Sequence, residues 1–178
     1  MKQRILPAIL ALALVPATAG AVDVGAGVYG GASFPILQDN AGNGSQFGVR
    51  VPVRLAPLLS VEGFYAQSAL GDVEETYGGV LYTRSGPDVT TWGATAVLNF
   101  GGSFRFYPLA GFGSTTIKQS GAEALTETSI NFGLGFGFSV MPKFAIDLRG
   151  ELNSVLTGDT SRKFANLTAG VSYALFGN

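Results

Sequence analysis

Apolar and polar residues alternate along most of the chain. The clearest segment covers residues 130–140, where Ile, Phe, Leu, Phe, Phe and Val share one face and Asn, Gly, Gly, Gly and Ser share the other. Residues 47–55, 144–152 and 166–175 repeat this pattern, and weaker versions cover residues 22–34, 59–68, 91–100 and 104–115. A period of two residues is typical of β-strands that present two different faces. The sequence therefore predicts an all-β domain of eight strands.

The connections between these segments alternate strictly between long and short. Those after the second, fourth and sixth strands are short, at residues 56–58, 101–103 and 141–142. Those after the first, third, fifth and seventh strands are longer, at residues 36–44, 69–90, 116–125 and 154–162. This rhythm is typical of an antiparallel membrane barrel with long extracellular loops and with short turns and both termini in the periplasm. Strands of about 10 to 14 residues are also long enough to cross a bilayer at a tilt.

Alternation alone leaves open which face of the barrel points outward. A soluble, lipocalin-like barrel would bury the apolar face, whereas a membrane barrel would turn it towards lipid. The polar face holds mainly Gly, Ser, Thr and Asn, and Lys118, Lys143 and Lys163 all fall in loops or at strand ends. The chain is 47% hydrophobic and only 13% charged, whereas about a quarter of a soluble chain is charged. These features favour an eight-stranded antiparallel up-and-down transmembrane β-barrel.

The inward-facing polar positions of such a barrel collect charges of both signs. Because an eight-stranded barrel is only wide enough for side chains to fill it, isolated charges inside would be costly and are expected to pair. We expect a salt-bridge network that plugs the lumen, with the choice of partners left open. Two alternatives remain: a gated ion path, in which one arginine changes partner, and a catalytic pair of carboxylates. The predicted network comprises Asp23, Arg50, Arg54, Glu62, Arg105, Asp147, Arg149 and Glu151.

Aromatic residues near the strand ends predict a girdle at the two membrane surfaces, where their amphipathic rings are usually enriched. Ordinary packing against neighbours is the alternative for any one of them. The candidates are Phe34, Trp92, Phe100, Phe104, Phe144, Tyr173 and Phe176.

The second long connection is acidic, with Asp72, Glu74, Glu75 and Asp88 against Arg84 alone. Such a loop could bind a divalent cation or a partner, and the alternative is a solvated surface. Residues 77–84, around Gly78-Gly79, predict a short hairpin that extends the barrel strands beyond the membrane.

Residues 1–21 predict a secretory signal peptide that precedes the barrel domain of residues 22–178. Lys2 and Arg4 come before an apolar run at residues 5–15, and Ala19 and Ala21 supply the small residues of a cleavage site. The alternative is an apolar N-terminal helix of a cytoplasmic domain. Without this segment the chain keeps 9 of its 11 basic residues against 12 acidic ones, a balance that favours no nucleic-acid partner.

The composition also argues against catalysis. The chain has no His and no Cys, so the usual general base, thiol nucleophile and zinc ligands are missing. We therefore expect a protein that is not an enzyme, with no catalytic residue, no metal and no cofactor.

The architecture and two local motifs make the chain similar to the small OmpA-like outer-membrane β-barrel family, from Val22 to Phe176. Residues 107–113, Tyr-Pro-Leu-Ala-Gly-Phe-Gly, resemble a Pro-then-Gly-x-Gly strand of that family. Residues 170–176, Gly-Val-Ser-Tyr-Ala-Leu-Phe, resemble the C-terminal signal read by the barrel assembly machinery. In that signal the aromatic residue normally ends the chain, whereas here Gly177 and Asn178 follow Phe176.

This resemblance implies an integral protein of the cell outer membrane. Its expected partners are outer-membrane lipids, the barrel assembly machinery through the C-terminal strand, and an extracellular ligand at the loops. It implies a structural role in envelope stability or in surface interaction, and the alternative is a narrow, gated, porin-like channel for ions or small solutes. The peptidoglycan-binding domain of longer family members is expected to be absent.

Overall fold

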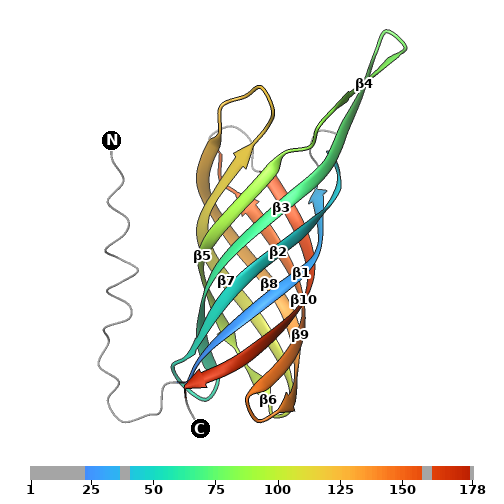
Figure 1. Ribbon diagram of the computed structural model, residues 1–178. Coiled ribbons are helices and arrows are strands. Elements are labelled where there is room, and N and C mark those ends of the chain that lie inside the picture. The colour runs from blue at the N-terminus through green and yellow to red at the C-terminus, as the bar shows by residue number, and fades with distance from the viewer. Residues whose placement is uncertain (1–22, 37–40, 158–161, 177–178) are drawn as a thin grey trace, which may run out of the picture.

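The computed structural model describes residues 23–36, 41–157 and 162–176, all of them in β-strands or the turns and loops between them (Figure 1). The predicted signal peptide, residues 1–21, lies outside the described residues. The strands are β1 (Asp23–Ile36), β2 (Ala41–Arg54), β3 (Leu59–Tyr77), β4 (Val80–Arg84), β5 (Asp88–Leu98), β6 (Phe100–Gly101), β7 (Phe104–Lys118), β8 (Leu125–Met141), β9 (Phe144–Val155) and β10 (Arg162–Phe176).

Eight of the described strands close into an antiparallel barrel. Each long strand pairs with its neighbours in the order β2-β1-β10-β9-β8-β7-β5-β3, and β3 pairs with β2 to complete the ring. The first and last strands of the chain pair along nearly their whole length, from Val24 opposite Phe176 to Ile36 opposite Lys163. The predicted eight-stranded antiparallel barrel is therefore confirmed. In the part of the chain that the structure describes, no helix is long and apolar enough to span a membrane.

One strand is much longer than its alternation predicted. The sequence placed residues 69–90 in a connection, but β3 is 19 residues long, ends at Tyr77 and pairs with β4 above the barrel. Gly78 and Gly79 join the two strands with φ of 58° and 82°, the left-handed conformation that a two-residue hairpin turn requires. Backbone pairing rather than apolar alternation extends this strand. The short hairpin expected at residues 77–84 is thus the tip of a longer one, made of β4 and the outer part of β3.

The two ends of the barrel differ. The short connections β2–β3, β5–β7 and β8–β9 lie at one end, together with the start of β1 and the end of β10, and we call it the turn end. The longer connections and the β3–β4 hairpin lie at the other end, which we call the loop end (Figure 1).

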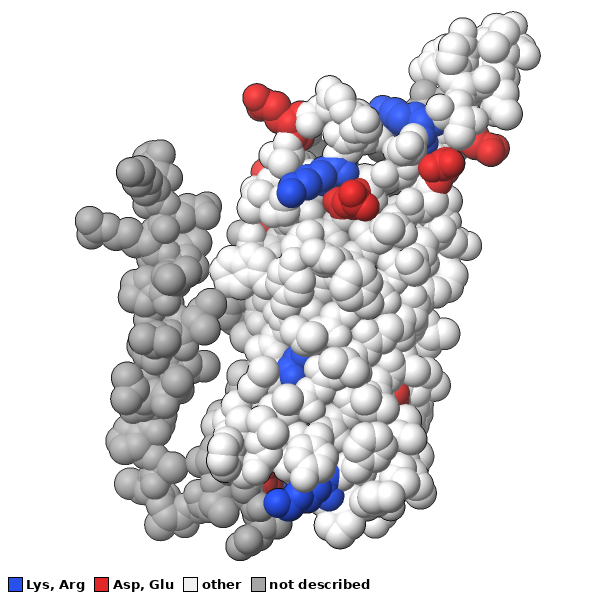
Figure 2. Space-filling model, viewed as in Figure 1, with Lys and Arg blue, Asp and Glu red and all other residues white. Residues whose placement is uncertain are grey.

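Polar residues line much of the inside of the barrel, and apolar residues cover its outside. The buried polar side chains include the charged Arg50, Glu62, Asp147 and Arg149, whereas the outward positions of β8, such as Phe132, are about half exposed. On the face shown in Figure 2, charged side chains gather at the two ends, and the band between them is almost free of charge. Surfaces of this kind suit a barrel in a bilayer, where closure satisfies every backbone hydrogen bond and the apolar band meets lipid.

Candidate functional site

The lumen contains a layer of five charged side chains near the middle of the barrel. Arg50 comes from β2, Glu62 from β3, and Asp147, Arg149 and Glu151 from successive inward positions of β9. The two-residue period of a strand places the three β9 residues in one column on the inner face.

Arg50 and Asp147 form one half of this layer. The Nη2 atom of Arg50 donates to both carboxylate oxygens of Asp147, at 2.7 and 2.8 Å. The Arg50 side chain is 3% exposed and that of Asp147 is 9% exposed, and the guanidinium lies 5.0 Å from the centre of the Tyr29 ring. The pair is therefore buried, and it joins strands whose positions in the sequence are far apart.

Arg149 forms the other half and contacts two acids. Its Nη1 and Nη2 atoms donate to the two carboxylate oxygens of Glu62 at 2.9 and 3.2 Å, a bidentate geometry that favours arginine. A longer contact of 3.3 Å joins Nη1 to Glu151. The ring of Tyr107 lies under the guanidinium at 5.2 Å. Glu62 is thus the main partner of Arg149, and Glu151 is a second acid within reach.

Towards the loop end, uncharged groups close the lumen. Asn131 donates to Thr95 at 3.1 Å, and Thr115 donates to Ser129 at 2.9 Å. Beyond them lies an apolar cap, a cluster of buried side chains from five strands that sequence reasoning missed. It consists of Leu70, Val89, Ile117, Val155 and Phe164.

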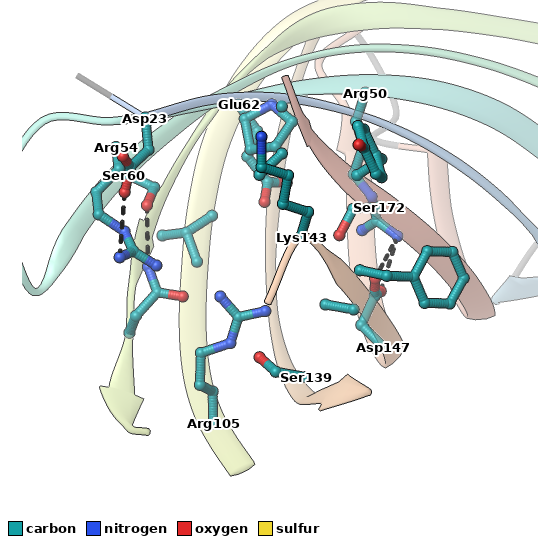
Figure 3. A pocket seen from close by; sticks show the side chains of 18 of the residues that line it. Asp23, Arg50, Arg54, Ser60, Glu62, Arg105, Ser139, Lys143, Asp147 and Ser172 are labelled. Carbon is teal, nitrogen blue, oxygen red and sulfur yellow. Dashed lines mark hydrogen bonds and ion pairs between the residues drawn. The ribbon is translucent and has the colours of Figure 1, made fainter. Parts of the chain in front are cut away.

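The turn end is hollow instead. A cavity of about 400 Å³ is lined by residues of all eight barrel strands and of the β8–β9 turn (Figure 3). Arg54 and Asp23 meet at its rim at 3.4 Å, with side chains 43% and 26% exposed. Arg105 extends into it and forms no ion pair with any residue that the structure describes. Of the eight residues predicted as one network, five thus form the central layer, two form a separate rim pair, and Arg105 stands apart.

The predicted aromatic girdle residues lie on the outer face, mostly at the turn end. Phe100, Phe104, Tyr173 and Phe176 are exposed there, and Phe144 pairs in register with Tyr173. Trp92 on β5 lies opposite Tyr65 on β3, and Phe34, near the loop end of β1, lies opposite Ala165 on β10. Their contact with the membrane surface stays a prediction.

The acidic residues of the second long connection are spread along the hairpin base. Asp72 accepts from the backbone nitrogen of Gly86 at 3.4 Å. Among the described residues, no group of three or more acidic side chains is arranged to hold a metal ion.

Comparison with known families matches this architecture. A model of the outer membrane protein beta-barrel domain matches residues 5–174. The chain belongs to this family. Because its members are barrels of the outer membrane, this protein is located in the outer membrane and sits in lipid.

Several solved structures share the fold. Neisserial surface protein A superposes with a TM-score of 0.63 at 16% identity, covering 87% of this chain and 99% of that one. A major outer membrane protein from Thermus thermophilus gives 0.60 at 14% identity, covering 88% and 100%. The N-terminal β-barrel domain of Pseudomonas aeruginosa OprF gives 0.54 at 16% identity, covering 87% and 100%. At these identities the likeness concerns the fold alone, and no curated protein sequence matches the chain.

Proposed function

We propose that this outer-membrane barrel is a closed structural protein of the envelope that presents a rigid hairpin for contacts at the cell surface. The observation that carries the proposal is the double closure of the lumen. The ion pairs of the central layer block its middle, and the apolar cap blocks its loop end.

The two barriers oppose conduction for different physical reasons. Opening the central layer means separating buried ion pairs, and removing the partner of a buried charge costs about 3–5 kcal/mol. Opening the cap means hydrating five buried apolar side chains, which are at most 8% exposed. An ion passing through the lumen would have to overcome both.

The surface role is supported by the β3–β4 hairpin. Tyr77, Val80, Leu81 and Tyr82 are each more than half exposed at its tip, and the Tyr77 and Tyr82 rings pack edge to face at 6.4 Å. At its base the Nε and Nη2 atoms of Arg84 lie 3.0 and 3.1 Å from the side-chain amide of Gln119, whose oxygen accepts from both. This contact connects the hairpin to the β7–β8 loop. An exposed cluster of apolar and tyrosine side chains, fixed in place by such contacts, is typical of an interaction surface.

Planar-bilayer recording tests the closed lumen. Purified protein is expected to give no steady openings, because both barriers are in place. Steady openings of the unaltered protein that Arg149→Ala abolishes would overturn the proposal.

Cysteine labelling tests the surface role. Because the chain has no native Cys, Thr83→Cys on the hairpin and Ser103→Cys in a short turn each give a single thiol. A membrane-impermeant maleimide is expected to label Thr83→Cys on intact cells, and Ser103→Cys only after the outer membrane is permeabilised. The reverse result would place the hairpin in the periplasm and end the proposed surface role.

A gated channel is the second candidate, and one observation favours it. Arg149 contacts both Glu62 and Glu151, so a shift towards Glu151 would release Glu62 and weaken the central layer while Arg149 keeps an acidic partner. The same recordings separate the two candidates.

Three further sequence predictions belong to this proposal. The N-terminal segment directs export as a cleaved signal peptide, and the last strand is recognised by the barrel assembly machinery. The protein is not an enzyme, which rests on a chain without His or Cys and on lumen carboxylates that are engaged by arginines.

A further inference from the structure

The cavity at the turn end carries an excess of positive charge. Of the described residues that line it, five are cationic and three are acidic. The acids are already engaged, because Asp23, Glu62 and Asp147 each pair with a different arginine. Two lining cations, Arg105 and Lys143, have no acidic partner among the described residues.

Arg105 is the more unusual of the two. Its Nε atom is buried and has no hydrogen-bond partner. Figure 3 shows its guanidinium reaching into the cavity between the Arg54–Asp23 pair and the Arg50–Asp147 pair, with no dashed line to a neighbour. Buried donors are nearly always satisfied in folded proteins, so an unpartnered one at the edge of a cavity indicates that the guanidinium can turn towards a bound water, ion or ligand.

The surroundings of Arg105 offer further polar groups. The hydroxyls of Ser60, Ser139 and Ser172 also line the cavity, and Lys143 lies in the turn at its mouth. The opposite position on β8 is Gly137, which has no side chain to fill the space beside the guanidinium. The cavity therefore combines a planar cation, a flexible cation and several hydroxyls around an empty volume of about 400 Å³.

We propose that this cavity binds a small solute carrying a phosphate group. Arginine binds phosphate oxygens through two parallel N–H donors, and the guanidinium of Arg105 reaches into the cavity with no acidic partner among the described residues. Lys143 would add a point charge at the mouth, and the serine hydroxyls would donate to the remaining oxygens. Because the site opens at the turn end, it samples solutes on that side of the membrane even when the lumen is closed.

The test is a titration of the detergent-solubilised barrel with inorganic phosphate. In an arginine-resolved NMR spectrum, the Arg105 Nε–H signal is expected to shift and saturate with phosphate, and not with chloride at equal ionic strength. Arg105→Gln is expected to weaken binding by about tenfold or more, as for loss of a charged hydrogen bond. Arg162→Gln removes a cation at the loop end and is the matched control, with affinity unchanged.

A second variant keeps the proposal testable if Arg105→Gln does not fold. Lys143→Gln lies in an exposed turn and is expected to weaken phosphate binding by a few-fold, while Lys163→Gln, near the loop end, leaves it unchanged. An Arg105 signal that does not respond to phosphate, or equal affinity in Arg105→Gln and the unaltered chain, would overturn the proposal and indicate that water satisfies this donor. Because conductance and phosphate binding are measured separately, failure here leaves the closed-barrel proposal standing.

Discussion

Replacing Asp147 with Asn tests whether the central ion pairs hold the barrel together. The change keeps the size of the side chain and removes its charge, so Arg50 keeps one acceptor oxygen in place of the two carboxylate oxygens at 2.7 and 2.8 Å. At about 4 Å between charge centres and an effective dielectric constant of about 20, the lost attraction is about 4 kcal/mol.

Asp147→Asn is expected to lower the free energy of unfolding by about 3 kcal/mol, at the lower end of the range of about 3–5 kcal/mol for breaking a buried pair. The expected loss is at the lower end because the Glu151 carboxylate lies in the same layer and can partly neutralise the charge of Arg50. Combining Asp147→Asn with Arg50→Met removes both charges, so the double variant is expected to lose less than the two single variants together, by about 2 kcal/mol.

Urea unfolding in lipid vesicles measures these free energies, with the single Trp, Trp92, as the fluorescent probe. Arg54→Met is the matched control, because the Arg54–Asp23 pair is partly exposed and is expected to contribute about 0–1 kcal/mol. Additive losses for Arg50 and Asp147, within about 0.5 kcal/mol, would refute the reasoning. So would a cost for Arg54→Met as large as that for Asp147→Asn.

Two further predictions concern the packing of the lumen and the lipid face. Gly135→Ala would push a methyl group into the Tyr107 ring and is expected to cost about 1–3 kcal/mol of stability. The measurement is the yield of the compact, heat-modifiable band on a detergent gel, which should fall. Gly150→Ala is the control, because its methyl group would point into open space and should leave that band unchanged. Phe132→Lys places a charge in the apolar band and is expected to cost about 2–4 kcal/mol in urea unfolding, whereas Leu81→Lys on the exposed hairpin should change stability by less than about 0.5 kcal/mol.

The sequence predicted the barrel well because alternation is a local signal. Every inward position of β8, from Ser129 to Ser139, is visible in the residue types alone. The length of β3 was not predictable, because from Val73 onwards its pairing with β4 replaces alternation as the reason for strand structure.

The lumen was predictable as a set of charges but not as a set of contacts. Which acid meets Arg50 depends on the tilt and register of strands that are distant in the chain, and no local pattern carries that information. The same limit separated Arg105 from the network it was expected to join. The apolar cap was missed because residues such as Val89 and Ile117 share the inward face of their strands with polar residues, and only the closed barrel brings the five cap residues together.

The ion pairs across the lumen have a consequence for how fast the barrel unfolds. Arg50 and Asp147 are 97 positions apart, and Glu62 and Arg149 are 87 apart. The pairing of β1 with β10 brings their strands together, so we expect both ion pairs to form late in folding. Contacts that form after the rate-limiting step of folding leave the folding rate almost unchanged and slow unfolding instead. These ion pairs should therefore slow the unfolding of the barrel, so that the folded protein has a long lifetime even if its free energy of unfolding is of typical size.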